Sequence, residues 1–348
     1  MRHRAFGKSR IVARRERGGP GLENGRGPCA AEGGTEKLEL WALALPEVRP
    51  GDSLAGMLVE AAANCGGLRP GDVLVVASKA ISKAEGLLVS LDRIHPSGEA
   101  RRLASKTGLD ARLLEVVLRN ADDLLFVVPL RVLAERGIID LGKLSPDPER
   151  ARELLERFPC EVFVRRGGAV YSSAGVDSSN HPPGVVSVVP ADPDAAARKL
   201  REEIGRLTGI DVPVVVTDSE YGPGLGTVDV ARGVSGLLPV ARRFGAPDRF
   251  GKPKFGGVDL IADEVAAAAA LLMGQCAEGV PAVLVRGLRY VPAEEGLRAF
   301  ALPAQGLAKA VRFSLLFSLR VLGWRWLARM VLRGLGARWA RSGGSASD

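Results

Sequence analysis

Short runs of β-branched residues, each bounded by turn-forming residues, alternate along this chain with stretches of helical periodicity. This alternation constrains the fold most, because the β-branched runs bury their apolar side chains as strands and the periodic stretches bury theirs as helices. It predicts helices over residues 54–64, 99–106, 111–119, 148–157, 194–206 and 262–273. It predicts strands over residues 38–45, 72–76, 124–128, 161–165, 185–189, 213–217 and 282–285. The spacing is too irregular for a (βα) barrel and indicates a mixed α+β fold.

The length of the chain suggests more than one compact part. Its 348 residues, 46% of them hydrophobic, provide ample material for a core and are many for a single domain. We therefore expect two lobes, whose boundaries need not be continuous, over residues 35–290. The segment 1–34 is rich in Arg and Gly and lacks periodicity, so it is expected to be a disordered basic leader. Residues 291–348 are expected to form a basic C-terminal extension.

The net charge of +8 would suit a nucleic-acid-binding protein, but its distribution argues against that class. The leader 1–34 carries +5 and the tail 304–348 carries +7, which leaves −4 for residues 35–303. The part of the chain that is expected to fold is therefore mildly acidic. No nucleic acid is expected as a partner.

The cysteines and histidines indicate neither a zinc site nor a disulfide framework. The four cysteines are solitary, and the three histidines form no ligand-spaced pair with them. The leader has no apolar stretch long enough for the core of a signal peptide. We therefore expect a protein of the reducing cytoplasm.

Polar residues at the ends of predicted strands are the first candidates for chemistry. The predicted strand 213–217 leads into Asp218 and Ser219, followed by a glycine-rich run over 222–226. Asp177 lies among small residues, where the backbone could approach a ligand closely. Carboxylates at such places can hold a cation that bridges phosphates. The alternative is that each Asp merely caps a turn, and spacing alone leaves both interpretations open.

A third cluster follows the predicted strand 72–76. It contains Lys79 and Lys83 together with the hydroxyls of Ser78 and Ser82. These groups could neutralise phosphate oxygens and donate hydrogen bonds to them, although their order is not that of a Walker A loop. The alternative is a solvated loop, since lysines are mostly exposed.

Taken together and in order, these segments resemble the coenzyme F420-0:L-glutamate ligase family, the γ-glutamyl ligases of F420 biosynthesis. The resemblance extends over residues 38–288. The segments that carry it are Ala44-Leu45-Pro46, residues 71–76, Ser78 with residues 81–86, Ala174-Gly175-Val176-Asp177 with Ser179-Asn180, Thr217-Asp218-Ser219, Gly233-Val234-Ser235-Gly236, Ala262-Asp263-Glu264, Leu272-Met273-Gly274 and Val285-Arg286-Gly287-Leu288. No single segment is rare, but their common order is specific.

The resemblance implies an enzyme that joins L-glutamate to the lactyl carboxylate of coenzyme F420-0, with GTP as phosphoryl donor and GDP as product. It implies a divalent metal pair, Mg²⁺ or Mn²⁺, assisted by K⁺, and activation of the carboxylate as an acyl phosphate. It also implies a two-lobed fold with mixed sheets that forms an intertwined homodimer, with the active site near the subunit interface.

Individual residues take their expected roles from the same resemblance. The implied catalytic residues are Asp177, Asp218 and Lys83. The implied metal ligands are Asp177, Asp218, Ser219 and Gln275. The implied nucleotide contacts are Leu43, Ala44, Leu45, Pro46, Ser78, Lys79, Lys83, Asn180, Met273, Gly274, Gln275 and Gly279.

Two positions depart from the family pattern. After Thr217-Asp218-Ser219, family members usually carry a Gly-Arg segment with a further arginine, whereas this chain continues with Glu220-Tyr221. Arginine is hard to replace where an anion is bound in a bidentate manner, so a ligase for a different acid and amine is an alternative. Gln275 stands where some members place a metal-binding Glu. A nucleotide-binding or membrane-associated scaffold without turnover is a further alternative.

Two segments lie outside the resemblance. Residues 131–160 are expected to be an insertion that adds a surface helix. In the tail, arginines recur at i, i+4 spacing, and the longest uncharged run, 313–319, has 7 residues. A membrane-spanning helix needs roughly 20 apolar residues. One expectation is therefore a basic amphipathic helix on an anionic membrane surface, and the alternative is packing on the body or on a partner subunit.

Overall fold

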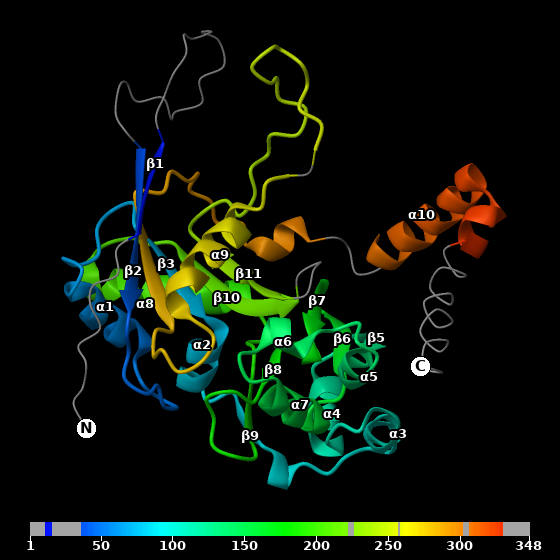
Figure 1. Cartoon of the computed structure of the whole chain (residues 1–348). Helices are drawn as coiled ribbons and strands as arrows, with labels where there is room; N and C mark the ends of the chain where they lie inside the picture. Colours follow the sequence, from blue (N-terminus) through cyan, green and yellow to red (C-terminus); the bar gives the residue numbers. More distant parts are fainter. Residues whose placement is uncertain (1–10, 16–35, 222–225, 257, 302–305, 330–348) are drawn as a thin grey trace, which may run out of the picture. The chain divides into compact units, whose positions relative to one another are not determined.

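The structure is a computed structural model that describes residues 11–15, 36–221, 226–256, 258–301 and 306–329 (Figure 1). The chain divides into two units, Met1–Phe300 and Ala301–Asp348, and each is described by itself. The first unit contains three sheets with helices between their strands, so the predicted mixed α+β class is confirmed. The two-lobed arrangement and the homodimer stay predictions.

The largest sheet has six strands in the order β1-β2-β12-β3-β10-β11. Their bounds are Ile11–Arg15, Glu36–Leu43, Ala282–Arg286, Val73–Ala77, Val214–Tyr221 and Thr227–Ser235. β10 pairs with β3 in parallel and the other neighbours are antiparallel, so the sheet is mixed. The apolar runs at the start of β3 and β10 are buried throughout, as expected for strands that are covered on both faces.

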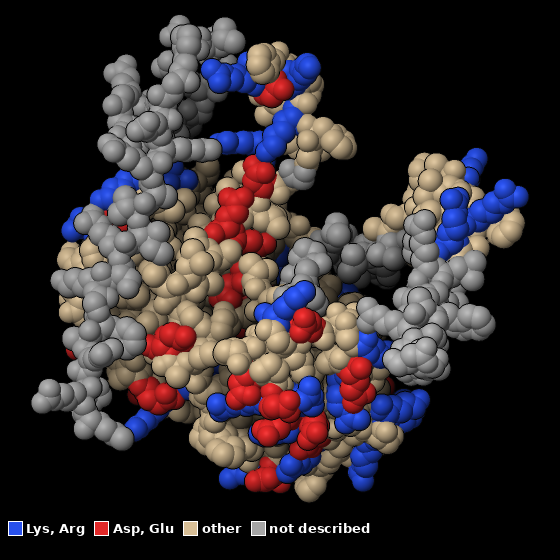
Figure 2. All heavy atoms as spheres, in the orientation of Figure 1, with Lys and Arg blue, Asp and Glu red and all other residues tan. Residues whose placement is uncertain are grey.

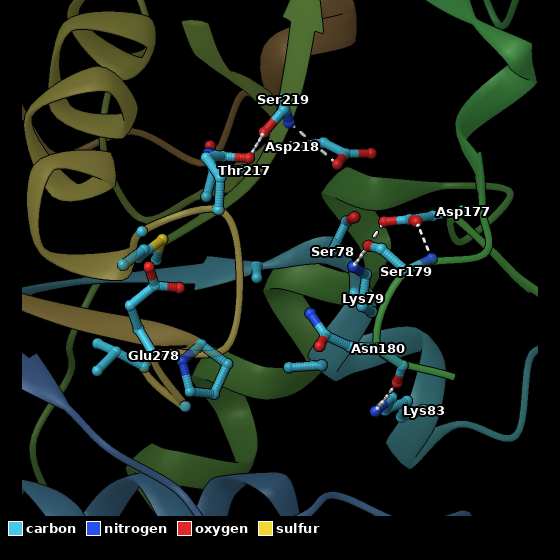
Figure 3. Close-up of a pocket in the computed structure, with 18 of the residues that line it drawn as sticks. Ser78, Lys79, Lys83, Asp177, Ser179, Asn180, Thr217, Asp218, Ser219 and Glu278 are labelled. Carbon is cyan, nitrogen blue, oxygen red and sulfur yellow. Dashed lines mark hydrogen bonds and ion pairs between the residues drawn. The ribbon is translucent and has the colours of Figure 1, made fainter. Parts of the chain in front are cut away.

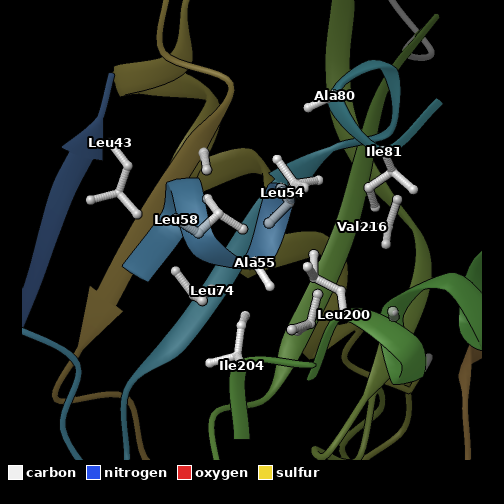
Figure 4. Packing of buried hydrophobic residues seen from close by; sticks show 14 of the residues in the cluster. Leu43, Leu54, Ala55, Leu58, Leu74, Ala80, Ile81, Leu200, Ile204 and Val216 are labelled. Carbon is white, nitrogen blue, oxygen red and sulfur yellow. The ribbon is translucent and has the colours of Figure 1, made fainter. Parts of the chain in front are cut away.

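Helices cover both faces of this sheet. Helices α1, α8 and α9 span Leu54–Ala63, Pro193–Thr208 and Ile261–Met273. Leu74 and Val76 of β3 belong to a cluster with α1 and α8 (Figure 4). Val73 and Val75 belong to a second cluster with α9. Successive side chains of β3 therefore point into two different cores, one on each face of the sheet. This explains why the strand is apolar without interruption.

Local signals set the ends of α8. The side chain of Asp192 accepts a hydrogen bond from the backbone N–H of Ala195, and Pro193 occupies the first turn. The helix stops at Gly209, whose φ of 71° lies in the left-handed region. These signals explain why the helix was predicted to within a few residues.

The other elements of the first unit form two three-stranded sheets, β5-β6-β7 and β4-β9-β8, with helices around them. Strands β4 to β9 span Leu88–Ser90, Asp123–Val128, Glu161–Arg166, Ala169–Ser172, Val176–Asp177 and Val185–Val188. Helices α2 to α7 span Ser78–Ala84, Gly98–Thr107, Ala111–Arg119, Leu130–Glu135, Leu141–Leu144 and Pro148–Arg157. Short 3₁₀ turns cover Leu91–Arg93, Ser173–Gly175 and Leu297–Phe300. A third hydrophobic cluster joins α3 and α4 to β6 and β7.

The segment predicted as an insertion contains most of three helices. α5, α6 and α7 lie between β5 and β6, and α7 covers the residues predicted for it. Figure 2 shows basic and acidic side chains interspersed over the lower part of the view, where α3 to α7 lie. Ion pairs such as Arg152 with Glu149 are exposed on both sides, which is typical of a solvated surface.

Two segments near the predicted site differ from what the sequence suggested. Residues 78–84 form α2 and not a solvated loop, and Ser78, Ser82 and Lys83 are buried. β10 does not end near residue 217 but continues to Tyr221, because the unpredicted strand β11 pairs with it along its whole length.

Part of the leader, which was expected to be disordered, forms a strand. Residues 11–15 form β1, which pairs in antiparallel fashion with β2. The edge of β2 would otherwise present unpaired backbone N–H and C=O groups, and β1 satisfies them. The rest of the leader and residues 222–225 of the glycine-rich run lie outside the described residues.

The second unit contains α10 (Gly306–Leu322) and a further helical stretch over residues 324–329. In the described part of this unit all charged residues are basic, and Figure 2 shows them among uncharged side chains. None of the helices in the described ranges combines the length and the apolar character needed to cross a bilayer. Residues 330–348 of the predicted extension lie outside the described residues.

Candidate active site

One pocket in the first unit brings together most of the residues that the sequence singled out. Its volume of about 480 Å³ lies in the range of small-molecule sites. It is lined by the turn after β2, the start of α2, the stretch from β7 to residue 180, the strands β10 and β11, and the turn between α9 and β12. Figure 3 shows side chains from these separate segments directed into the same space.

The first wall of the pocket is formed by α2 and the loop before β9. Lys83 on α2 is buried, and its Nζ donates to Glu47 Oε1 at 2.5 Å and to the backbone oxygen of Asn180 at 2.9 Å. Ser82 is also buried, and its hydroxyl donates to the backbone oxygen of Val188 at 2.8 Å. These bonds fix one positive charge at the edge of the pocket.

Asp177 completes this wall. Its Oδ2 forms an ion pair of 2.6 Å with Lys79 Nζ, and its Oδ1 accepts a hydrogen bond of 2.6 Å from the backbone N–H of Ser179. Lys79 also donates to the hydroxyl of Ser179. Burial raises the pKa of Asp177, but the charge of Lys79 and these hydrogen bonds together lower it below its ordinary value. Asp177 is therefore an ionised carboxylate at neutral pH.

An unusual backbone segment places Asp177. Ser173, Ala174 and Gly175 have φ values of 44°, 57° and 69°, so three successive residues lie in the left-handed region. Ala174 is fully buried, and a Cβ on Gly175 would come within 2.7 Å of Val189 Cγ2. The surrounding packing holds this strained turn, which directs the chain into β8.

The second wall is formed by β10 and β11. Their register pairs Ser219 with Asp229, so the two side chains lie next to each other on one face. The Ser219 hydroxyl lies 2.8 Å from Asp229 Oδ1 and 2.8 Å from Gln275 Oε1. Gln275, which comes from the turn after α9, donates through Nε2 to Asp229 Oδ1 at 2.9 Å. Three oxygen-bearing side chains from separate segments thus form one cluster.

Asp218 lies beside this cluster in the middle of β10. Figure 3 shows its carboxylate and that of Asp177 directed toward the same part of the pocket. Burial has the largest effect on its pKa and raises it to about 6, assisted by the negative charge of Asp177 and opposed by the positive charge of Arg232. The ionised form of Asp218 is therefore costly in the protein alone and would gain from a nearby cation.

These donors fit a hard divalent cation. Asp177, Asp218, Ser219 and Gln275 all offer oxygen atoms and all line the same pocket. Oxygen ligands are those that Mg²⁺ and Mn²⁺ prefer. Two carboxylates that come together, one of them with a raised pKa, provide the negative charge that such an ion would compensate.

A β-bulge supports the second wall. The register of β10 and β11 shifts in mid-strand and leaves Arg232 as the extra residue on β11. Its buried guanidinium donates to Glu220 and, at 3.0 Å, to the backbone oxygen of Val170, while its Cζ lies 3.9 Å from the centre of the Tyr171 ring. These contacts tie β7 to β10 and β11.

Most predicted nucleotide contacts line the pocket. They are Leu45, Pro46, Ser78, Lys79, Lys83, Asn180, Met273, Gly274, Gln275 and Gly279. Leu43 and Ala44 are not among the lining residues. Leu43 is the last residue of β2 and its side chain is buried in the cluster with α1, while Ala44 is exposed. Side chains alternate along a strand, which is why Leu43 faces the core.

The sequence interpretation missed several residues that line the pocket. Two of them are Glu47 and Asp229. Asp229 escaped notice because β11 was not predicted. The alternation of Val228, Asp229 and Val230 could have indicated that strand, and pairing with β10 then places Asp229 opposite Ser219.

Comparisons with known proteins agree with the geometry of the site. The chain matches the family model described as F420-0:Gamma-glutamyl ligase over residues 42–287. It is 41% identical over 244 residues to the coenzyme F420:L-glutamate ligase of Methanopyrus kandleri, covering 70% of this chain and 84% of that protein. The protein of the same name from Methanothermobacter thermautotrophicus is 35% identical over 246 residues, covering 70% and 86%. That from Haloarcula marismortui is 34% identical over 262 residues, covering 73% and 88%.

The matched region contains all the segments that line the pocket. The resemblance that rested on short motifs is therefore confirmed by a match over most of the chain. The chain belongs to the F420-0:gamma-glutamyl ligase family.

Proposed function

We propose that this protein is a GTP-dependent ligase that joins L-glutamate to coenzyme F420-0 through an amide bond, with GDP and phosphate as products. The observation that carries the proposal is the construction of one pocket, with Lys79, Lys83 and Asp177 on one wall and Asp218 and Ser219 on the other. The name shared by the relatives, coenzyme F420:L-glutamate ligase, supports the choice of acceptor and amino acid.

Amide formation from a carboxylate requires activation, because a carboxylate is a poor electrophile. A carboxylate oxygen of F420-0 attacks the γ-phosphorus of GTP, and the bond to the bridging oxygen breaks, which gives GDP and an acyl phosphate. The amine of glutamate then attacks the acyl carbon, the nitrogen loses a proton, and phosphate leaves with the electron pair. The protein mainly positions the reactants and compensates their charge.

The first wall serves the nucleotide in this proposal. Lys83 is held at a fixed place by Glu47 and by the backbone of Asn180, so its charge faces phosphate without reorganisation. Lys79 can exchange its partner Asp177 for a phosphate oxygen. The Ser78 hydroxyl and the Asn180 side chain are the expected hydrogen-bonding groups at the same wall.

The second wall serves the cations. Asp218, Ser219 and Gln275 on this wall would hold the Mg²⁺ or Mn²⁺ pair together with Asp177 of the first wall, with K⁺ as an assisting ion. The bound divalent ions would neutralise phosphate oxygens and make the γ-phosphorus more electrophilic. The carboxylates keep their positions because one lies on a paired strand and the other follows the packed left-handed turn.

We also propose that the chain forms an intertwined homodimer with the pocket near the subunit interface, as the family resemblance implies. Sedimentation velocity at micromolar concentration tests this. A species near twice the chain mass of 36.7 kDa is expected, and a monomer at all concentrations would contradict it.

A second candidate function keeps the nucleotide chemistry but joins a different acid and amine. Glu220 favours it, because this residue stands where the family pattern continues with Gly-Arg. Arg232 does not fill the gap, since it donates to Glu220 and to Val170 and is not among the residues that line the pocket. An acceptor with fewer negative charges than F420-0 would suit such a site better.

A mass-resolved ligation assay separates these functions. Purified protein is mixed with F420-0, L-glutamate and Mn²⁺, with GTP or ATP in parallel reactions. A product heavier by one or two glutamyl residues, formed with GTP and absent for Asp218→Asn, is the expected result. Metal-dependent GTP binding without this product would favour the second candidate, and failure to turn over GTP with any acceptor would indicate a non-catalytic nucleotide-binding protein.

For the C-terminal unit we propose contact with an anionic membrane surface. Phe313, Phe317 and Trp324 are 74%, 60% and 71% exposed within the described structure, and the charged residues between 306 and 329 are all basic. Co-sedimentation with phosphatidylserine vesicles is expected for the full chain and is expected to weaken in high salt. Equal sedimentation of a chain that ends at Phe300 would contradict this.

A further inference from the structure

Asp229 lies at the centre of the second wall without a role in the activity described above. It is 6% exposed and sits on β11 directly opposite Ser219. A single oxygen, Oδ1, lies within hydrogen-bond distance of both the Ser219 hydroxyl, at 2.8 Å, and Gln275 Nε2, at 2.9 Å. The carboxylate is thus shared by two residues that offer oxygen atoms to the pocket.

The contact with Asp229 fixes the orientation of the Gln275 amide. A carboxylate accepts hydrogen bonds and does not donate them, so the NH₂ end of the amide must face Asp229. The other end, Oε1, then lies 2.8 Å from the Ser219 hydroxyl oxygen. The opposite orientation would bring the amide oxygen against the carboxylate.

The same carboxylate decides where the Ser219 proton goes. The hydroxyl has one proton and two acceptors within reach, Asp229 Oδ1 and Gln275 Oε1. An ionised acceptor binds the proton more strongly than a neutral amide oxygen. With its proton on the side of Asp229, Ser219 keeps its lone pairs for another partner.

The result is a pair of oxygen atoms prepared for a cation. Ser219 Oγ and Gln275 Oε1 lie 2.8 Å apart, and neighbouring ligands in an octahedral site with bonds of about 2.0–2.1 Å lie about 2.8–3.0 Å apart. Gln275 is neutral, and hard cations prefer charged ligands. The carboxylate of Asp229, next to both oxygens, supplies the missing negative charge.

We propose that Asp229 is a positioning residue of the metal end of the pocket: it orients Ser219 and Gln275 so that both of their oxygens face a divalent cation, and it supplies the charge that the amide lacks. This rests on the proposed function, because it assumes that a divalent cation binds at the second wall. Asp229 and Gln275 act as a pair, in which one position carries a carboxylate and the other carries an amide.

Exchanging the carboxylate and the amide between the two positions tests this. The variants are Asp229→Asn, Gln275→Glu and the double variant with both changes, which returns one carboxylate and one amide to the pair. Asp263→Asn is the matched control, because Asp263 also accepts a hydrogen bond from β11, at Ala231 N, but does not line the pocket. Mn²⁺ binding in the presence of GDP is measured by the loss of the free Mn²⁺ signal in electron paramagnetic resonance.

Asp229→Asn is expected to weaken Mn²⁺ binding about 10–100-fold at an unchanged melting temperature. The double variant is expected to bind within about threefold of the wild type, by the same reasoning, and Asp263→Asn to bind like the wild type. A double variant that binds no better than Asp229→Asn would overturn the charge sharing, and this comparison stands even if Gln275→Glu alone fails to fold. Equal binding by wild type and Asp229→Asn would overturn the inference alone, whereas absence of saturable binding to the wild type would overturn the proposed function as well.

Discussion

The two walls of the pocket differ in how their charges are compensated. On the wall formed by α2 and the loop before β9, each carboxylate faces a lysine: Asp177 pairs with Lys79, and Glu47 pairs with Lys83. On the wall formed by β10 and β11, the hydrogen bonds to Asp218 and Asp229 come from neutral backbone, hydroxyl and amide groups.

This difference would suit different ligands at the two walls. The first wall is close to neutral within itself, so a phosphate can replace Asp177 as a partner of Lys79 at small cost. The second wall holds negative charge in excess, and burial raises the pKa of Asp218 to about 6 although the positive charge of Arg232 opposes this. The proposed function therefore places the cation at the second wall and the nucleotide phosphates between the two walls.

The largest expected effect is that of Asp218→Asn, which removes the charge that distinguishes the second wall. We expect the ligation rate to fall roughly 100- to 1000-fold, the scale on which loss of one electrostatic group in an active site acts. The assay of product mass against time measures this. Asp263→Asn removes a carboxylate that accepts a hydrogen bond from β11 but does not line the pocket, and it is expected to retain the wild-type rate. A rate for Asp218→Asn within threefold of the wild type would remove the distinction between the walls.

The next effect concerns the first wall. Lys83→Met removes the buried cation that Glu47 and the Asn180 backbone hold in place. A hydrogen bond to a charged group contributes about 1.5–3 kcal/mol, so the dissociation constant for GTP is expected to rise roughly 10- to 100-fold. Isothermal titration calorimetry measures it. Lys199→Met is the control, since Lys199 also pairs with a glutamate, Glu85, but lies outside the pocket. An equal effect of both variants would indicate a general charge effect.

The overall architecture could be predicted because its signals are local. The valine-rich runs of β3 and β10 indicated buried strands, and α7 was predicted residue for residue from its helical periodicity. Two acids of the site were also identified: Asp218 because it follows the predicted strand 213–217, and Asp177 because it lies in a run of small residues.

The remaining features depend on contacts between distant segments. α2 has only 7 residues. The buried lysine on it, Lys83, is held by Glu47 and Asn180, which lie 36 and 97 residues away in the sequence. β11 contains Asp and Gly, which have low strand propensity, and pairing with β10 overrides that preference. Asp229 therefore became visible as part of the site only once the strands were placed side by side.

A third substitution, Gly175→Ala, tests whether the first wall depends on the strained turn before Asp177. Gly175→Ala places a Cβ at a φ of 69° and within 2.7 Å of Val189 Cγ2. We expect a loss of stability of roughly 2–4 kcal/mol, together with weaker metal binding because Asp177 follows two residues later. Gly209→Ala is the control: its φ is 71° but no atom lies within 4 Å of the added Cβ, so only the backbone cost of about 1–2 kcal/mol is expected. Urea unfolding measures both, and equal losses would show that the close approach to Val189 is unimportant.

The smallest effect compares the two carboxylates directly, through the stability of the metal-free protein as a function of pH. The folded-state pKa of Asp177 is lowered, so this group contributes stability above its unfolded pKa near 3.8, and that contribution is lost as the pH falls through the folded value. The folded-state pKa of Asp218 is raised to about 6, so this group costs stability above pH 6, and the cost disappears as the pH falls from 6 to below 3.8.

Asparagine variants at the two positions are therefore expected to shift stability in opposite directions. At pH 7.5 in EDTA, Asp177→Asn should unfold at lower urea than the wild type and Asp218→Asn at higher urea, each by on the order of 1–3 kcal/mol or less. The advantage of Asp218→Asn should shrink between pH 6 and pH 4, because the wild-type carboxyl takes up its proton in that window. Shifts of the same sign at pH 7.5 would mean that the two walls do not differ in charge compensation, and that the raised pKa of Asp218 does not mark the place of a cation.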